Sequence, residues 1–334
     1  MVIDLPFIWA FLIAFAVLAY IVLDGFDLGV GILFPFLRSD RHRDHAMNSV
    51  APIWDGNETW LILGGGGLFA TFPLAYAVIM PALYAPIIAM LLGLIFRGVA
   101  FEFRWKTKRG QWIWDWSFAL GSFTAAFAQG IALGALVQGI EVVDRAYSGG
   151  WWDWLTPFSL LTGIAVVVGY ALLGSTWLIL KTEGDVQLHA YRIAWGTAAG
   201  TLVLIGVVSL WTPFLHPVFM ERWFSWPAIL YAAPVPLFVL AAAASLFTGL
   251  NSRQDLRPFL SAQALFVLSF IGIGISFYPH IVPPALTIDE AAAPDASLLF
   301  LLVGASVLIP VILAYTAYTY WIFRGKLVDA ESYH

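Results

Sequence analysis

The amino-acid sequence predicts an all-α integral membrane protein with about nine transmembrane helices. Hydrophobic residues make up 61% of the 334 residues, and charged residues make up only 11%. Soluble globular chains carry roughly 25% charged residues, and a soluble core of this length could not bury so much apolar surface. The apolar residues also gather in runs of the ~20 residues that a helix needs to cross a bilayer. We therefore expect residues 1–334 to form a single polytopic membrane domain.

Nine apolar runs are candidates for the membrane-spanning helices. In chain order they cover residues 7–37, 53–72, 75–101, 114–140, 158–180, 193–215, 228–250, 258–278 and 297–323. The run 53–72 is the least regular, because it carries Asp55, Glu58 and four successive glycines, so a re-entrant hairpin is an alternative there. Two four-helix bundles plus one peripheral helix would accommodate the nine segments.

Basic residues alternate in step with these runs. If every run crosses the membrane, 14 of the 16 Lys and Arg residues fall on one side, and only Arg145 and Arg222 fall on the other. Because Lys and Arg mark cytoplasmic loops, we expect the N-terminus outside and the C-terminus in the cytoplasm. The first run has no basic start and no small-residue cleavage site, so we interpret it as a retained helix rather than a signal peptide.

Residue types that hold metals are scarce in the predicted membrane interior. The chain has no cysteine, which excludes thiolate sites and disulfides within this chain. Its six histidines all fall in loops or near the ends of the apolar runs: His42, His45, His189, His216, His280 and His334. We therefore expect no haem or metal ion to be ligated by this chain alone. No basic run suggests a nucleic-acid partner.

Acidic residues inside the apolar runs are the strongest candidates for chemistry, because a charge in a bilayer is costly. Asp24 and Asp27 are three residues apart, so they share one face of the first predicted helix. Asp55 and Glu58 have the same spacing and, from helix rise, about the same depth in the cytoplasmic third of the membrane. Clustered carboxylates can pass protons on, as they do in pumps.

One basic and one acidic residue of the third run could support such a proton path. Arg97 and Glu102 lie near its predicted cytoplasmic end. A static alternative stays open, in which Asp24 forms an ion pair with Arg97 and Asp55 caps the start of its helix. We expect Asp115 to be a cap or an interfacial residue.

Long motifs in this chain closely resemble subunit II of cytochrome bd-type quinol oxidases. The first is Asp24-Gly-Phe-Asp-Leu-Gly-Val-Gly31, and the second is Asn48-Ser-Val-Ala-Pro-Ile-Trp-Asp-Gly-Asn-Glu-Thr-Trp60. The segments 96–104 and 309–318 are also similar to the family, so the resemblance runs from the first helix to the last. It is greatest to the cyanide-insensitive branch, where Gly98 stands in place of a proline found in other members.

The resemblance implies a subunit of a respiratory complex in the bacterial inner membrane that oxidises quinol and reduces dioxygen to water. In such complexes haem b and haem d are held mainly by subunit I, and subunit II stabilises the assembly. A structural quinone or lipid on this chain and small single-helix accessory subunits are further expectations of the family. The resemblance assigns proton-path roles to Asp27 and Asp55, and less directly to Asp24 and Glu58.

Two other functions remain alternatives at this point. A secondary transporter could use the same carboxylates to bind a coupling ion, although transporters usually place such sites at mid-depth between two related halves. A purely structural subunit would use them only as ion pairs.

Overall fold

The helices follow the predicted apolar runs, which are interrupted at Leu83 and at Ala233. The computed structural model describes residues 4–327. Asp4 starts α1 by accepting a hydrogen bond from the N–H of Phe7. The first half of the chain forms α1 (Leu5–Leu33), the 3-10 turn η1 (Phe34–Phe36), α2 (Asp40–Val50), α3 (Trp54–Thr71), α4 (Pro73–Ala82), α5 (Tyr84–Phe103) and α6 (Gln111–Gln138).

The second half of the chain adds long helices and several short elements. It forms α7 (Pro157–Lys181), α8 (Gly184–Trp211), the 3-10 turn η2 (Thr212–Phe214), α9 (Pro217–Phe224), α10 (Ile229–Ala232), α11 (Pro234–Asn251), α12 (Leu256–Phe277), α13 (Ile288–Ala291) and α14 (Asp295–Ile322). Two small antiparallel hairpins, β1 (Val142–Val143) with β2 (Ala146–Tyr147) and β3 (His280–Val282) with β4 (Leu286–Thr287), lie in the loops.

Eight helices of the described chain are long and apolar enough to cross a membrane. The predicted span 53–72 forms the single continuous helix α3 beside α1, so the re-entrant hairpin does not occur. At 1.5 Å per residue its 18 residues extend ~27 Å, close to the ~30 Å thickness of the bilayer core. The prediction of an all-α membrane fold with about nine spanning helices is confirmed.

The predicted span 75–101 is wrong in its first part. The chain breaks at Leu83 into the ten-residue α4 and the twenty-residue α5, and only α5 is long enough to span. Pro86 has no N–H to donate to the carbonyl of Ala82, and its ring collides with that carbonyl in a continuous helix. Proline in the sequence therefore ends α4 where hydropathy alone predicts no break.

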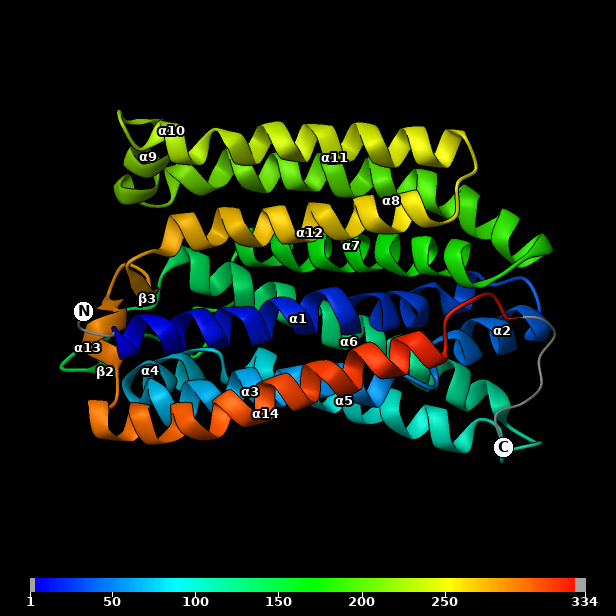
Figure 1. Ribbon diagram of the computed structural model, residues 1–334, viewed down its shortest axis with the longest axis horizontal. Helices are drawn as coiled ribbons and strands as arrows, with labels where there is room; N and C mark the ends of the chain where they lie inside the picture. Colours follow the sequence, from blue (N-terminus) through cyan, green and yellow to red (C-terminus); the bar gives the residue numbers. More distant parts are fainter. Residues whose placement is uncertain (1–3, 328–334) are drawn as a thin grey trace.

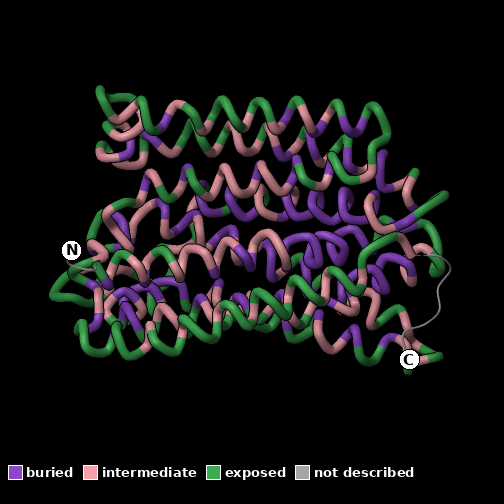
Figure 2. The backbone as a smooth tube through the Cα atoms, viewed as in Figure 1, coloured by how far each residue is buried: buried purple, intermediate pink, exposed green. Residues whose placement is uncertain are grey.

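The helices stand side by side in two groups. α1, α3, α5 and α6 form one group, α7, α8, α11 and α12 form the other, and the two meet where α1 and α6 pack on α7 (Figure 1). Buried residues concentrate along this junction, whereas α14 lies on the outside and has a single buried residue, Leu298 (Figure 2). The predicted pair of bundles with one peripheral helix matches this arrangement.

Glycines set the closest helix contacts at the junction. A Cβ on Gly29 of α1 would lie 1.8 Å from the carbonyl oxygen of Tyr170, and one on Gly174 of α7 would lie 2.3 Å from the carbonyl carbon of Gly29. No side chain larger than hydrogen fits between these two backbones. The contact fixes one half of α1 against α7. Asp24 and Asp27 lie in this half, which is the half predicted to be nearer the cytoplasm.

The two ends of the bundle differ in charge. We call the end that carries α2, the end of α1 and the end of α14 the basic end, because the predicted cytoplasmic Lys and Arg residues lie there (Figure 1). The other end, the far end, carries α9, α13 and both hairpins (Figure 1). The start of α1 and the end of α14 lie at opposite ends, as an odd number of spans requires.

Candidate functional site

A buried ion triad joins three helices in the half of the bundle nearer the basic end. Arg97 of α5 donates from Nη1 to Oδ1 of Asp24 on α1 at 2.6 Å, and from Nη2 to Oε2 of Glu58 on α3 at 2.6 Å. The side chains of Arg97 and Asp24 have no exposed surface, and that of Glu58 is 26% exposed. Glu58 is therefore the member of the triad that is open to the outside.

A second chain of hydrogen bonds begins three residues further along α1. The side-chain amide of Asn57 donates to Oδ2 of Asp27 at 2.7 Å and to the carbonyl of Leu23 at 3.3 Å. The hydroxyl of Tyr320, from α14, donates to Oδ1 of Asn57 at 3.0 Å. Asp27 is fully buried, and no cationic side chain among residues 4–327 forms an ion pair with it.

The polar network continues one turn toward the middle of the bundle. Gln129 of α6 donates to the hydroxyl of Tyr20 at 2.7 Å and accepts from the hydroxyl of Tyr170 at 2.9 Å. These three side chains come from α1, α6 and α7, so the network follows the junction between the two helix groups. We call the triad, the Asp27 chain and this tyrosine pair together the polar network.

Several polar atoms of the network have no hydrogen-bond partner among the described residues. They are Oδ2 of Asp24, Oδ1 of Asp27 and Nε of Arg97, and all three are buried. A buried polar atom without a partner is costly, and it commonly marks a place for water or a functional group. The network holds three carboxylates but only one guanidinium, which contacts Asp24 and Glu58, so the network can balance its charge by taking up protons.

Asp55 and Glu102 lie outside the buried part of this network. The side chain of Asp55 is exposed in the first turn of α3 and makes no hydrogen bond or ion pair with the described residues. Glu102 is exposed at the end of α5 and pairs with Lys106 at 3.4 Å, one turn away from it. The expected shared position of Asp55 and Glu58 is therefore only partly realised, because Glu58 turns toward Arg97 and Asp55 turns away.

The structure contains the ion pair that the static alternative predicts for Asp24. Its carboxylate does pair with Arg97. Asp115, in contrast, does more than cap a helix: its Oδ1 accepts from Nε of the buried Arg104 at 2.6 Å. Arg104 also donates to Oδ1 of Asp44 at 2.7 Å, and this second ion cluster ties α2 to the start of α6 at the basic end.

The predicted site lacks Asn57, Gln129 and Tyr320. The sequence carries a signal for the first two, because Asn57 lies between Asp55 and Glu58 and Gln129 is an amide in the middle of an apolar run. Tyr320 carries no such signal, because tyrosine near the end of a span is an ordinary interfacial anchor.

The described histidines all lie at the two ends of the bundle. His42, His45 and His189 are at the basic end, and His216 and His280 are at the far end; His334 lies outside the described residues. Burial, and next to it the neighbouring His189, lower the pKa of His42, so this imidazole is uncharged at neutral pH. Among residues 4–327 no three His, Cys, Asp or Glu side chains are placed to hold a metal ion. No histidine among residues 4–327 therefore lies in the middle of the bundle, where it could be an axial haem ligand inside the membrane.

The family model and the related sequences that match this chain all point to the same protein family. The model of the family "Cytochrome bd terminal oxidase subunit II" matches residues 5–323. The chain is 33% identical to cytochrome bd-I ubiquinol oxidase subunit 2 of Escherichia coli K12, over 98% of this chain and 96% of that protein. It is 28% identical to cytochrome bd ubiquinol oxidase subunit 2 of Bacillus subtilis, over 97% of both chains.

The fold also has a solved counterpart. A chain of the bd oxidase from Geobacillus thermodenitrificans superposes with a TM-score of 0.75 at 16% identity, covering 96% of this chain and 99% of that one. At this identity the likeness bears on the fold alone. The assignment to the cyanide-insensitive branch stays a prediction.

Proposed function

Because the chain belongs to the cytochrome bd terminal oxidase subunit II family, we propose that it stabilises the haem-bearing subunit I and conducts cytoplasmic protons toward oxygen reduction. The family makes it a multi-pass inner-membrane subunit of a bd-type quinol oxidase complex. Haem b and haem d belong to the partner subunit in this proposal, and they supply the electron transfer to dioxygen. This chain supplies hydrogen-bonding and acidic side chains.

The observation that carries the proton path is the position of the polar network. Its acids lie in the half of the bundle nearer the basic end, and basic loops face the cytoplasm. We therefore place the basic end on the cytoplasmic side, with the N-terminus outside. Protons for water formation then enter from the side on which the acids are gathered.

Asp55 is the proposed entrance. It lies three residues, or ~4.5 Å along the helix axis, nearer the basic end than Glu58. Glu58 is partly exposed and contacts Arg97, which contacts the fully buried Asp24. A proton that reaches Glu58 is thus next to the buried acids without crossing an apolar layer. Asp27 is the proposed inner carrier, because no cationic side chain of the described chain pairs with its carboxylate.

The exposed side of α3 is the proposed contact with the partner. Asp55, Thr59, Ile62, Gly66 and Phe69 follow one another at helical spacing, and all are exposed. A Cβ on Gly66 would meet nothing within 4 Å. A carboxylate and an open glycine on the outside of a membrane helix suit a closely packed protein partner better than lipid.

The test uses the assembled complex in its own membrane. Asp27→Asn and Asp55→Asn should each slow oxygen reduction about tenfold or more, while the haem absorption spectrum is retained, because the amide keeps the shape but carries no exchangeable acid proton. Asp185→Asn is the matched control, since Asp185 is exposed at the same end and distant in the chain from the network. Full turnover in both test variants would end the proton-path proposal.

A purely structural role is the second candidate, and the Asp24–Arg97 ion pair favours it. A double-mutant cycle between Asp24 and Arg97 separates the two roles. If the carboxylates serve only as ion pairs, the double variant loses less stability and less turnover than the two single variants together. If they also carry protons, only stability shows this coupling, and turnover stays low. The cycle between Asp27 and Arg97 is the control, because Asp27 accepts from Asn57 and makes no ion pair with Arg97.

A further inference from the structure

We propose that the groove between α11 and α12 binds one anionic phospholipid, with its phosphate on Arg257 at the basic end. This groove lies on the α11 edge of the molecule, opposite α5 and α14 (Figure 1). It is separate from the polar network and does not depend on the proposed proton path. Its cavity volume is about 1120 Å³.

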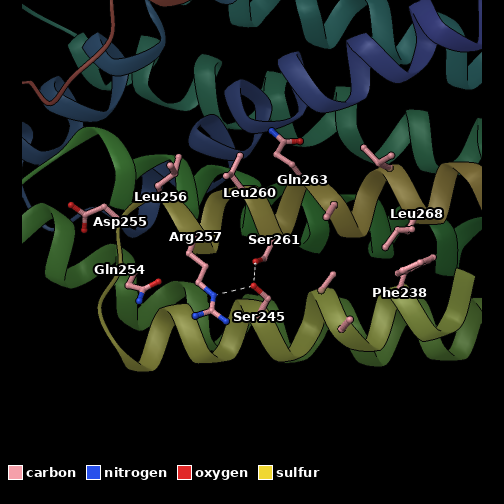
Figure 3. A pocket seen from close by; sticks show the side chains of 14 residues that line it. Phe238, Ser245, Gln254, Asp255, Leu256, Arg257, Leu260, Ser261, Gln263 and Leu268 are labelled. Atoms are coloured by element: carbon pink, nitrogen blue, oxygen red, sulfur yellow. Dashed lines mark hydrogen bonds between the residues drawn. The ribbon is translucent and has the colours of Figure 1, made fainter. Parts of the chain in front are cut away.

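The walls of the groove are apolar and its depth comes from small residues. Phe238, Leu260, Val267 and Leu268 form the sides, and Ala241 and Ala264 leave the hollow between them. Figure 3 shows Phe238 and Leu268 at one end of the groove and Arg257 at the other. From Arg257 to Leu268 the groove extends ~16 Å along α12, which is about half the ~30 Å hydrocarbon core and therefore the length of the acyl layer of one leaflet.

A polar cluster closes the groove at the basic end. Arg257 donates from Nε to the hydroxyl of Ser245 at 3.0 Å, and the hydroxyl of Ser261 donates to Ser245 at 2.9 Å (Figure 3). These bonds hold the guanidinium between the two helices. Its two Nη groups contact no acceptor among the described residues, so they are free to donate to a phosphate as a pair.

The charge of the cluster fits an anion. The groove lining has two charged side chains, Arg257 and Asp255. Asp255 is already engaged, because its carboxylate pairs with Lys326 at 2.6 Å and accepts from Gln187 at 2.9 Å and Tyr191 at 3.1 Å. Arg257 is therefore the uncompensated charge, and a phosphate that carries no cation of its own complements it better than a zwitterionic head group.

The first test measures lipid binding to the purified complex. The complex is depleted of lipid in mild detergent and titrated with phosphatidylglycerol or phosphatidylcholine of the same acyl chains, and bound lipid is counted by native mass spectrometry. We expect Arg257→Gln to lower phosphatidylglycerol occupancy about fivefold or more, from the loss of one cation at the membrane surface. Arg253→Gln removes the same charge four residues away, outside the groove lining, and should leave occupancy unchanged.

The second variant pair tests the groove itself without changing charge. Ala241→Phe fills the hollow and should lower occupancy, whereas Ala244→Phe, on the same helix but outside the lining, should not. The haem spectrum of each variant reports whether the complex is still assembled. Unchanged phosphatidylglycerol binding in Arg257→Gln would overturn the proposal, and so would equal binding of both lipids to the unaltered complex. The proposal would also fail if Ala241→Phe released a bound quinone from the complex and left the bound phospholipid in place.

Discussion

Asp24 and Asp27 form a matched pair for separating stability from proton transfer. Both are fully buried on α1, but Asp24 contacts Arg97 at 2.6 Å and Asp27 contacts the neutral Asn57 at 2.7 Å. Replacing either by asparagine keeps the shape and the accepting oxygen. The two variants therefore differ mainly in whether an ion pair is lost.

The expected size of the difference follows from the geometry. With the charge centres of Asp24 and Arg97 ~4 Å apart, their attraction is about 4 kcal/mol at an effective dielectric constant near 20. Part of this is offset, because the neutral amide of D24N has no desolvated charge and Arg97 still pairs with Glu58 at 2.6 Å. We expect D24N to lower the free energy of unfolding by about 2 kcal/mol, or about thirtyfold in the unfolding constant. D27N should change it by less than about 1 kcal/mol.

The assay is an SDS titration of the assembled complex in mild detergent, followed by tryptophan fluorescence, with oxygen consumption measured on the same samples below the transition. The D24N complex should unfold at a lower SDS concentration than the unaltered complex. The D27N complex should unfold at the same SDS concentration as the unaltered complex but consume oxygen more slowly. Equal unfolding midpoints for the two variants, or a lower midpoint for D27N, would refute the charge argument.

Three further changes test the packing around the network. Gly29→Ala should prevent assembly of the complex, measured as yield of the purified oxidase, because the new methyl group would meet the backbone oxygen of Tyr170. Arg104→Gln should lower the free energy of unfolding by about 3 kcal/mol in the same SDS titration, because two carboxylates lose their buried partner. Tyr320→Phe removes the hydrogen bond to Asn57 and should lower it by about 1 kcal/mol.

Each of these changes has a control of the same kind. Gly196→Ala on α8 meets nothing within 4 Å and should assemble normally. Arg109→Gln removes a basic residue from the exposed loop before α6, and Tyr318→Phe removes the hydroxyl of a side chain that is 58% exposed. A control that fails as badly as its test variant would mean that the named contact is not the cause.

Hydropathy and charge predicted most of the fold, because a helix that crosses a bilayer must satisfy all its backbone groups internally and must be apolar over a known length. The break at Leu83 escaped hydropathy, since Pro81 and Pro86 are themselves apolar, but the prolines could have predicted it. Element lengths set by backbone hydrogen bonds are thus harder to predict than element existence.

The site was predictable only as far as helical spacing reaches. Spacing of three places Asp24 and Asp27 on one face, and the same rule put Asp55 with Glu58. Helical spacing could not predict that Glu58 turns inward and Asp55 turns outward, because the two edges of a broad helix face meet different neighbours. The Tyr320–Asn57 bond joins residues 263 positions apart, and no local pattern specifies such a contact.

The hydrogen bond between Tyr320 and Asn57 can form only late in the synthesis of the chain. The polypeptide leaves the ribosome N-terminus first, so α1 and α3 are made while α14 is still untranslated. Asp27 and Asn57 can meet early, but the hydroxyl that completes their chain arrives with the last helix. A nascent subunit is therefore unfinished at its acidic centre until synthesis is almost over, and a chain shortened before Tyr320 would carry an open network into the membrane.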